Sequence, residues 1–133
     1  ALGELVKRFE AQSGVRSELQ IKGQSPEITG DTELILYRIV QESLTNISKH
    51  AQARHAWVSL TKDPLSLVVG VRDDGNGFEV ERPQGEGGGE VKLGLFGMQE
   101  RAALIGGTLR IRSTPGAGTE ITAIVPVRSA ASV

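Results

Sequence analysis

Residues 65–77 read LSLVVGVRDDGNG, an apolar strand that runs directly into two aspartates and a glycine-rich turn. Four apolar residues at alternate positions are expected to share the buried face of this strand: Leu65, Leu67, Val69 and Val71. The same parity directs Asp73 inward and Asp74 elsewhere. A carboxylate aimed into a protein is costly unless a donor reaches it, and the exocyclic amine of adenine is such a donor. Because Asp-Gly and Asn-Gly pairs are also ordinary turn formers, a simple turn remains the alternative at this point.

Composition bounds the remaining possibilities. The chain has 133 residues, 15 basic and 16 acidic side chains and a formal charge of −1, which argues against a strongly basic nucleic-acid surface. It has no cysteine, so disulfides and thiolate metal sites are excluded. No apolar run approaches the length of a membrane span, and the N-terminus lacks signal-peptide features. We expect one domain over 1–133, cut or processed from a longer chain, with its core at about 15–127 and a frayed tail at 128–133.

Hydrophobic periodicity and turn residues predict the elements. Helices are expected at 2–13, from a cap at Asp31 or Thr32 to about Ala51, and at 95–107, and strands at 15–21, 55–62, 65–73, 108–114 and 119–127. Residues 75–94 are dominated by glycine and charge, so they are expected to form a long functional or disordered loop. This order predicts an α/β (α+β) two-layer sandwich, with a mixed, mostly antiparallel sheet and helices on one face.

The middle helix carries two stripes over residues 33–51. Its core face is expected to comprise Tyr37, Val40, Leu44, Ile47 and Ala51. The opposite face carries Arg38, Glu42, Asn46 and Lys49, with His50 at its edge. The amide oxygen of Asn46 suits Mg²⁺, Lys49 and His50 could neutralise phosphate charge, and Glu42 could orient water or a hydroxyl. An ordinary solvated face explains this stripe equally well.

Other nucleotide and metal motifs fail on spacing. Gly75 breaks the calcium-loop pattern, Val80 stands where a dinucleotide fingerprint needs its third glycine, and no glycine precedes a Lys-Ser or Lys-Thr pair.

Four segments in order resemble the boxes of the Bergerat-fold (GHKL) ATPases, the group that includes gyrase, MutL and the histidine kinases. QESLTNISKHA (41–51) resembles the asparagine box, DDGNGF (73–78) and LGLFGMQERA (93–102) the two glycine boxes, and GAGTEITAIVPV (116–127) the closing hairpin. Order and spacing match over about 31–127. YRIVQESLTN, the Lys-His pair and GLFGMQERA are most similar to sensor histidine kinases of the NarX/DesK-like branch.

The resemblance implies specific roles. Asn46 would bind Mg²⁺ and act with Glu42 in catalysis, Asp73 would accept the adenine amine, and 79–93 would form a mobile lid over the phosphates. Further nucleotide contacts are implied for Lys49, His50, Gly75, Gly77, Gly94, Leu95, Gly97 and Thr119. The phospho-accepting histidine of such kinases lies on a preceding dimerisation helix, and neither His50 nor His55 fits that role.

The expected function is therefore the catalytic ATP-binding domain of a two-component sensor histidine kinase. It would bind ATP or ADP with Mg²⁺ and present the γ-phosphate to a dimerisation and phospho-acceptor domain that this chain lacks, so alone it would be inactive as a kinase. A response regulator would be an indirect partner. We expect a cytoplasmic domain with no nucleic-acid or membrane contact, in a bacterial kinase that is either membrane-anchored or soluble. The alternatives are a nucleotide-binding regulatory module without phosphotransfer, or another GHKL ATPase.

Overall fold

The computed structural model describes residues 2–23, 30–77 and 89–126, without the side chains of residues 50, 51 and 89–93. Its helices are α1 (Leu2–Ser13), α2 (Gly30–Asn46), a π-helical turn η1 (Ile47–Ala51) and α3 (Gly89–Leu104). Its strands are β1 (Arg16–Gly23), β2 (His55–Lys62), β3 (Ser66–Asp73), β4 (Thr108–Ser113) and β5 (Thr119–Pro126).

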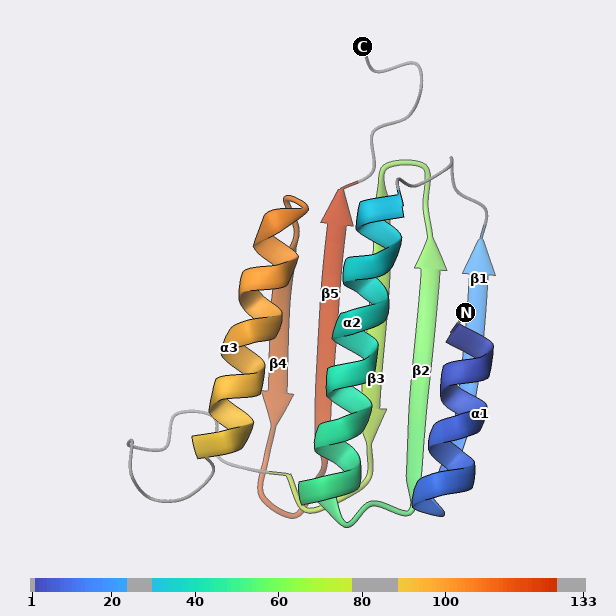
Figure 1. The fold of residues 1–133 in the computed structure, drawn as a ribbon, viewed down its shortest axis with the longest axis vertical. Helices are drawn as coiled ribbons and strands as arrows, with labels where there is room; N and C mark the ends of the chain where they lie inside the picture. The colour runs from blue at the N-terminus through green and yellow to red at the C-terminus, as the bar shows by residue number, and fades with distance from the viewer. Residues whose placement is uncertain (1, 24–29, 78–88, 127–133) are drawn as a thin grey trace.

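The strands form one five-stranded sheet in the order β1-β2-β3-β5-β4. β1 pairs with β2 in parallel, and the other three pairings are antiparallel. α1, α2 and α3 all cover the same face of the sheet (Figure 1). The predicted two-layer sandwich, with a mixed, mostly antiparallel sheet and helices on one face, is confirmed.

The core lies between the helices and the sheet. The alternation predicted for β3 holds, since Leu67, Val69 and Val71 are at most 3% exposed and Asp73 is 4% exposed. Leu65 was predicted on the same face, and this is wrong, because it is 73% exposed. The strand begins only at Ser66, whose carbonyl accepts a hydrogen bond from the Asp63 amide, so Leu65 lies in the turn between β2 and β3.

The buried face of α2 is wider than predicted. Val40, Leu44 and Ile47 are buried as expected, and three further buried residues broaden the stripe: Leu36, Ile39 and Ser43. The Ser43 hydroxyl donates to the Ile39 carbonyl at 2.7 Å and lies 3.3 Å from the Met98 sulfur, which joins α2 to α3. η1 ends at Gln52, which has a left-handed φ of 51°.

α3 begins at Gly89, six residues before the predicted start. Residues 89–94, predicted as the end of a long loop and mostly within the lid, are therefore helical. Leu95, Met98 and Ala102 of α3 are buried. Val91 stands four residues before Leu95, so the apolar spacing extends into the first turn, but Gly94 and the glycines at 85 and 87–89 favour a loop there. The rest of the predicted lid, 79–88, and the tail 128–133 lie outside the described residues.

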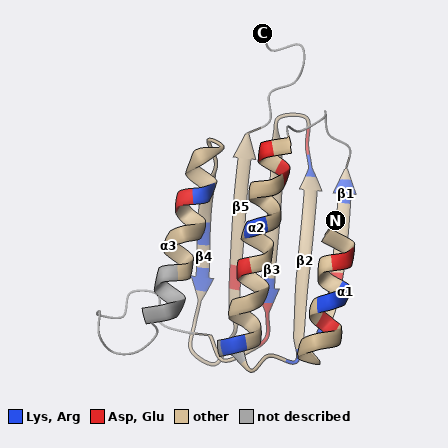
Figure 2. Ribbon diagram, in the orientation of Figure 1, with Lys and Arg blue, Asp and Glu red and all other residues tan. Residues whose placement is uncertain are grey.

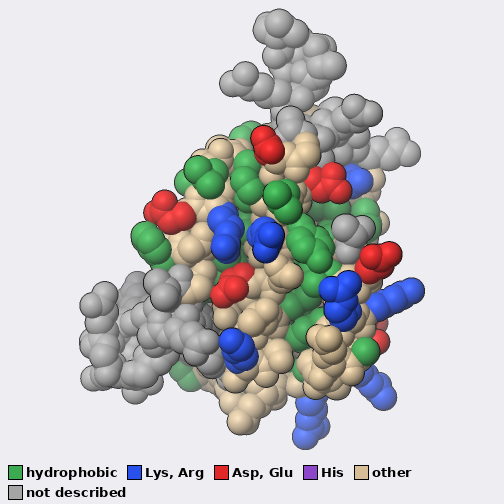
Figure 3. Space-filling view, viewed as in Figure 1, with side chains coloured by type: hydrophobic (Ala, Val, Ile, Leu, Met, Phe, Trp, Pro, Cys, Tyr) green, Lys and Arg blue, Asp and Glu red, His purple; other side chains and the backbone are tan. Residues whose placement is uncertain are grey.

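Side chains of both signs are interspersed on the helices (Figure 2), and apolar atoms show between α1 and α2 in the space-filling view (Figure 3). Within the described ranges, no helix is long and apolar enough to cross a membrane.

Candidate nucleotide-binding site

The predicted site segments meet at one end of the sandwich. The C-terminal end of α2, the end of β3, the turn between β4 and β5 and the start of α3 all lie at this edge (Figure 1). Segments more than 70 residues apart in sequence thus come together there. A cavity of about 200 Å³ opens at the ends of β3, β4 and β5, but its charged lining residues Arg72, Arg112 and Glu120 form one register row whose parity is opposite to that of Asp73. This cavity therefore belongs to the sheet face opposite the helices.

Asp73 is a buried carboxylate at the end of β3. Its Oδ1 accepts a hydrogen bond of 2.7 Å from the Gly75 amide, and Thr119 is its register partner on β5. Burial raises the pKa of Asp73 above its ordinary value of 3.8; the Gly75 and Thr119 amides oppose this rise, and the charge of Asp74 adds to it. An ionised carboxylate accepts at both oxygens, so Asp73 can bind a further donor.

Two glycines allow the turn after β3 to touch the β4–β5 hairpin. Gly118 has φ +86°, and a Cβ there would overlap the Asp73 carbonyl oxygen. Gly77 has φ +65°, and a Cβ there would overlap the Thr114 carbonyl oxygen. The Gly116 amide donates to the Asn76 carbonyl at 2.6 Å. The two loops therefore form one wall beside Asp73, and side chains at either glycine would separate them.

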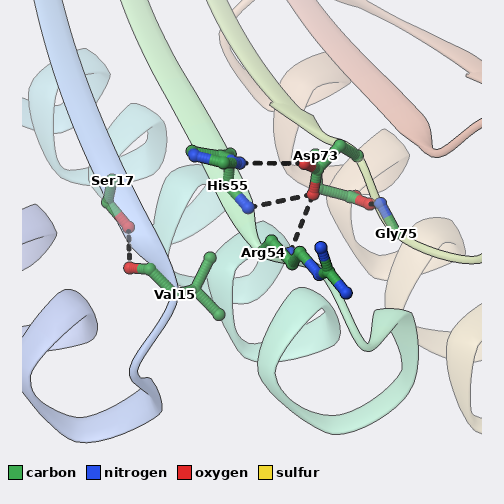
Figure 4. Close-up of polar contacts among 7 residues, drawn as sticks. Val15, Ser17, Arg54, His55, Asp73 and Gly75 are labelled. Atoms are coloured by element: carbon green, nitrogen blue, oxygen red, sulfur yellow. Dashed lines mark hydrogen bonds and ion pairs between the residues drawn. The ribbon is translucent and has the colours of Figure 1, made fainter.

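Asp74 holds the same turn to the start of β2. Its Oδ1 accepts hydrogen bonds from the amides of Arg54 and His55, at 2.8 and 2.9 Å, and its Oδ2 lies 3.0 Å from the His55 Nδ1. The dashed lines that start at Arg54 and His55 in Figure 4 mark these contacts. These contacts, with the His55 amide as the largest, lower the pKa of Asp74 to about 2. Sequence reasoning predicted only that Asp74 points away from the core. Its partners follow the irregular turn after η1, which no local pattern revealed.

Glu42 and Asn46 of α2 lie beside Gly94 of α3. A Cβ at Gly94 would stand 2.6 Å from Glu42 Oε1 and 3.6 Å from Asn46 Nδ2. Both side chains are half-buried. Asn46 Nδ2 is buried and has no hydrogen-bond partner among the described residues. Because the amide nitrogen is a donor, its partner would be an acceptor such as a water or a phosphate oxygen.

The remaining predicted nucleotide contacts lie on η1 and α3. Lys49 is exposed on η1, and His50 belongs to the same turn. Leu95 is buried in the core, and Gly94 and Gly97 lie within α3. The placement of Gly94 in a loop over 75–94 is therefore wrong, Gly97 lies in a helix as predicted, and a contact of any of these residues with nucleotide stays a prediction.

The described residues contain no group of three His, Cys, Asp or Glu side chains that could hold a metal ion. Asn46 and Glu42 nevertheless fit Mg²⁺, which typically takes one or two protein oxygens and completes its shell with water and substrate phosphates.

This edge carries the four predicted boxes, and the sequence matches the family described as histidine kinase-, DNA gyrase B- and HSP90-like ATPase over residues 31–129. The chain belongs to this family. It is 34% identical over 127 residues to the signal transduction histidine-protein kinase/phosphatase DegS of Brevibacillus brevis, covering 95% of this chain and 31% of DegS. It is 37% identical over 122 residues to the oxygen sensor histidine kinase NreB of Staphylococcus carnosus, covering 91% of this chain and 34% of NreB.

The fold is similar to that of the blue-light activated histidine kinase of Erythrobacter litoralis, with a TM-score of 0.70 at 22% identity, over 94% of this chain and 40% of that one. The predicted GHKL family and the likeness to sensor histidine kinases of the NarX-like branch are confirmed. The chain spans about a third of the length of DegS and NreB.

Proposed function

We propose that this chain is the catalytic ATP-binding domain of a sensor histidine kinase, which binds MgATP at the edge formed by α2, β3 and the β4–β5 hairpin. The observation that carries the proposal is the Asp73 carboxylate, which is 4% exposed, accepts the Gly75 amide and lies beside the wall made by the two loops. A carboxylate is retained in such surroundings at a cost in folding free energy, and a ligand donor would offset that cost.

Asp73 would select adenine. The exocyclic amine of adenine donates to the carboxylate, whereas guanine and hypoxanthine place a carbonyl oxygen at the same position of the ring. Two acceptors that face each other repel and leave a buried group unpaired. Gly75, Gly77 and Thr119 would complete this end of the site, since their backbones surround Asp73.

The phosphates would extend from Asp73 towards Glu42 and Asn46. Asn46 would hold Mg²⁺ through its side-chain oxygen, and the bound ion would neutralise charge on the phosphates. His50 on η1 would add positive charge beside them. Lys49 lines the groove between α1 and α2, so it would reach the phosphates by turning its side chain out of that groove. Glu42 would orient the attacking group or a metal-bound water from the same face of α2. Gly94, Leu95 and Gly97 would act through the position of α3 over this stripe.

Phosphotransfer would use a histidine on a dimerisation domain outside this chain. The protein would contribute mainly position and charge neutralisation, because in-line transfer demands that the acceptor nitrogen approach opposite the leaving oxygen. His55 is held by Asp74 and is unsuited to that approach. A response regulator would receive the phosphate in turn. ATP is a cytoplasmic substrate, so we propose a cytoplasmic location for the domain, as a single folded unit over 1–133.

The first test is nucleotide binding by calorimetry. The wild-type chain should bind ADP with Mg²⁺ more tightly than GDP, and Asp73→Asn should weaken ADP binding by about 2–4 kcal/mol, because it supplies a donor where an acceptor is needed. Equal ADP affinity in the two proteins would contradict the adenine assignment.

The second test is transfer. With γ-labelled ATP, acid-labile phosphate should appear on histidine only when a dimerisation segment from a related kinase is added or fused. Stoichiometric label on histidine in the chain alone would contradict the proposal that the acceptor histidine lies on a separate dimerisation domain.

A further inference from the structure

The residues on either side of Asp73 are both attached to β2. The Arg72 guanidinium carbon lies 4.3 Å from the centroid of the Trp57 ring, and Asp74 pairs with His55. Asp73 itself pairs in register with Ala56, which separates His55 from Trp57 and is 1% exposed. Successive side chains of a strand point to opposite faces. His55 and Trp57 are therefore directed to the sheet face opposite the helices, and Asp73 is directed towards the helices.

His55 and Trp57 also contact each other. Their rings are stacked, with centroids 5.7 Å apart and an interplanar angle of 19°. Four side chains thus form a continuous series from one neighbour of Asp73 to the other, which we name the bracket: Arg72, Trp57, His55 and Asp74. A cation over an indole and a stacked ring pair each contribute modest attraction, and in series they restrict the two backbone positions next to Asp73.

Asp74 makes the most specific contacts of the bracket. Besides the three hydrogen bonds to its carboxylate, its own amide donates to the His55 carbonyl at 3.3 Å. Residues 54, 55 and 74 are therefore fixed to one another by main chain as well as side chain. An ordinary Asp-Gly turn requires no such attachment to another strand.

The geometry points to the bracket as the device that holds the Asp73 carboxylate in place, with Asp74 as a positioning residue for adenine selectivity; this inference rests on the proposed function. Base selectivity depends on an acceptor that cannot move away when a carbonyl oxygen arrives in place of an amine. A site of this kind requires its groups to be held within about 0.5 Å of their productive positions. If the turn after β3 were mobile, the Asp73 carboxylate could move away from the carbonyl oxygen of hypoxanthine. Adenine and hypoxanthine nucleotides would then bind with similar affinity.

The experiment compares the dissociation constants of ADP and IDP by calorimetry, well below the unfolding temperature. IDP replaces the adenine amine with a carbonyl and leaves the sugar and phosphates unchanged. Asp74→Ala should reduce the preference for ADP by about five- to tenfold, which corresponds to one or two lost hydrogen bonds. Asp74→Asn keeps an oxygen acceptor for the Arg54 and His55 amides, so it should retain most of the preference.

Asp63→Ala is the matched control. Asp63 is an exposed acid at the other end of the same β2–β3 hairpin, and its loss should leave the ADP-to-IDP ratio unchanged. If Asp74→Ala does not fold, His55→Ala removes the ring contact and the stack while keeping the amide, and it should lower the ratio in the same direction.

Two outcomes would overturn the inference. An unchanged ratio in folded Asp74→Ala, or equal weakening of ADP and IDP, would show that Asp74 is merely structural. Asp73→Asn separates this failure from failure of the proposed function. If Asp73→Asn abolishes the preference and Asp74→Ala does not lower it, only the bracket is wrong. If Asp73→Asn also leaves the ratio unchanged, the adenine assignment fails.

Discussion

Gly94 of α3 lies so close to Glu42 of α2 that a methyl group on Gly94 would stand 2.6 Å from the Glu42 Oε1. Among the described residues outside its own helix, no atom lies within 4 Å of such a position at Gly97, one turn later. Replacing an interior helix glycine by alanine gains about 1 kcal/mol of stability from helix propensity alone. At Gly94 part of this gain is lost in moving Glu42.

We therefore predict that Gly97→Ala raises the free energy of unfolding in urea by about 0.5–1 kcal/mol, and that Gly94→Ala raises it by less. In a Glu42→Ala background the obstruction is gone, so Gly94→Ala should recover the full gain. Equal gains at the two glycines in the wild-type background would contradict the close approach of α2 and α3.

The β4–β5 hairpin offers a second matched pair of glycines. Gly116 and Gly118 have φ of +82° and +86°, but only Gly118 packs against the backbone of Asp73. Gly116→Ala should cost about 1–2 kcal/mol for its left-handed conformation. Gly118→Ala should cost about 2–4 kcal/mol, because main chain must also shift, and it should weaken ADP binding. Similar costs for the two variants in urea unfolding would count against contact between the hairpin and β3.

Alternation and spacing predict much of this arrangement. The parity of Leu67, Val69 and Val71 correctly assigns Asp73 to the buried face, because strand period is fixed by the backbone. The same rule fails at Leu65, since parity does not reveal where a strand begins. The wide face of α2 is only partly predicted. The predicted stripe is too narrow to include the apolar Leu36 and Ile39, and Ser43 is buried through hydrogen bonding and not through apolar character.

The features that local sequence patterns miss depend on tertiary contact. The first turn of α3 follows a run of glycines, and a single apolar residue, Val91, continues the helical spacing into it, which is a weak local signal beside so many glycines. The attachment of Asp74 to Arg54 and His55 joins residues about 20 positions apart across an irregular turn. The family motif identifies Asp73 and assigns no role to Asp74, although Asp74 is the residue that joins the turn to β2.

The raised pKa of Asp73 predicts how ADP affinity depends on pH. In the folded protein Asp73 binds its proton more tightly than in the unfolded chain, so its contribution to stability falls as pH rises from 3.8 through the raised value. Adenine requires the ionised form. ADP affinity should therefore weaken as pH falls below the raised pKa, by up to about tenfold per pH unit.

The same titration of Asp73→Asn serves as the control, because ionisation of the ADP phosphates contributes equally to both proteins. The wild type should show the steeper loss of ADP affinity on acidification, and this loss should begin at a pH above the ordinary carboxyl pKa of 3.8. Parallel curves for the two proteins would show that the Asp73 carboxylate does not receive the adenine amine.

Asn46 should govern the response to magnesium and leave base selection intact. Its amide nitrogen is buried and has no partner within the described part of the chain, and it lies with Glu42 beside Gly94 of α3. Asn46→Asp keeps an oxygen for the metal but adds a negative charge next to the phosphates. We expect metal-free ADP binding to weaken by about 1 kcal/mol or more from this repulsion, and added Mg²⁺ to recover much of the loss. The ADP-to-IDP ratio should stay within about twofold of wild type, because Asp73 is untouched.

Gln41→Glu is the control. It places the same charge on the same helix, but its side chain lines the groove between α1 and α2, so it should leave the magnesium response unchanged. Titration of ADP with and without Mg²⁺ in the three proteins measures these effects. A wild-type magnesium response in Asn46→Asp would show that Asn46 is not the ligand, and a matching change in Gln41→Glu would show that net charge alone is responsible.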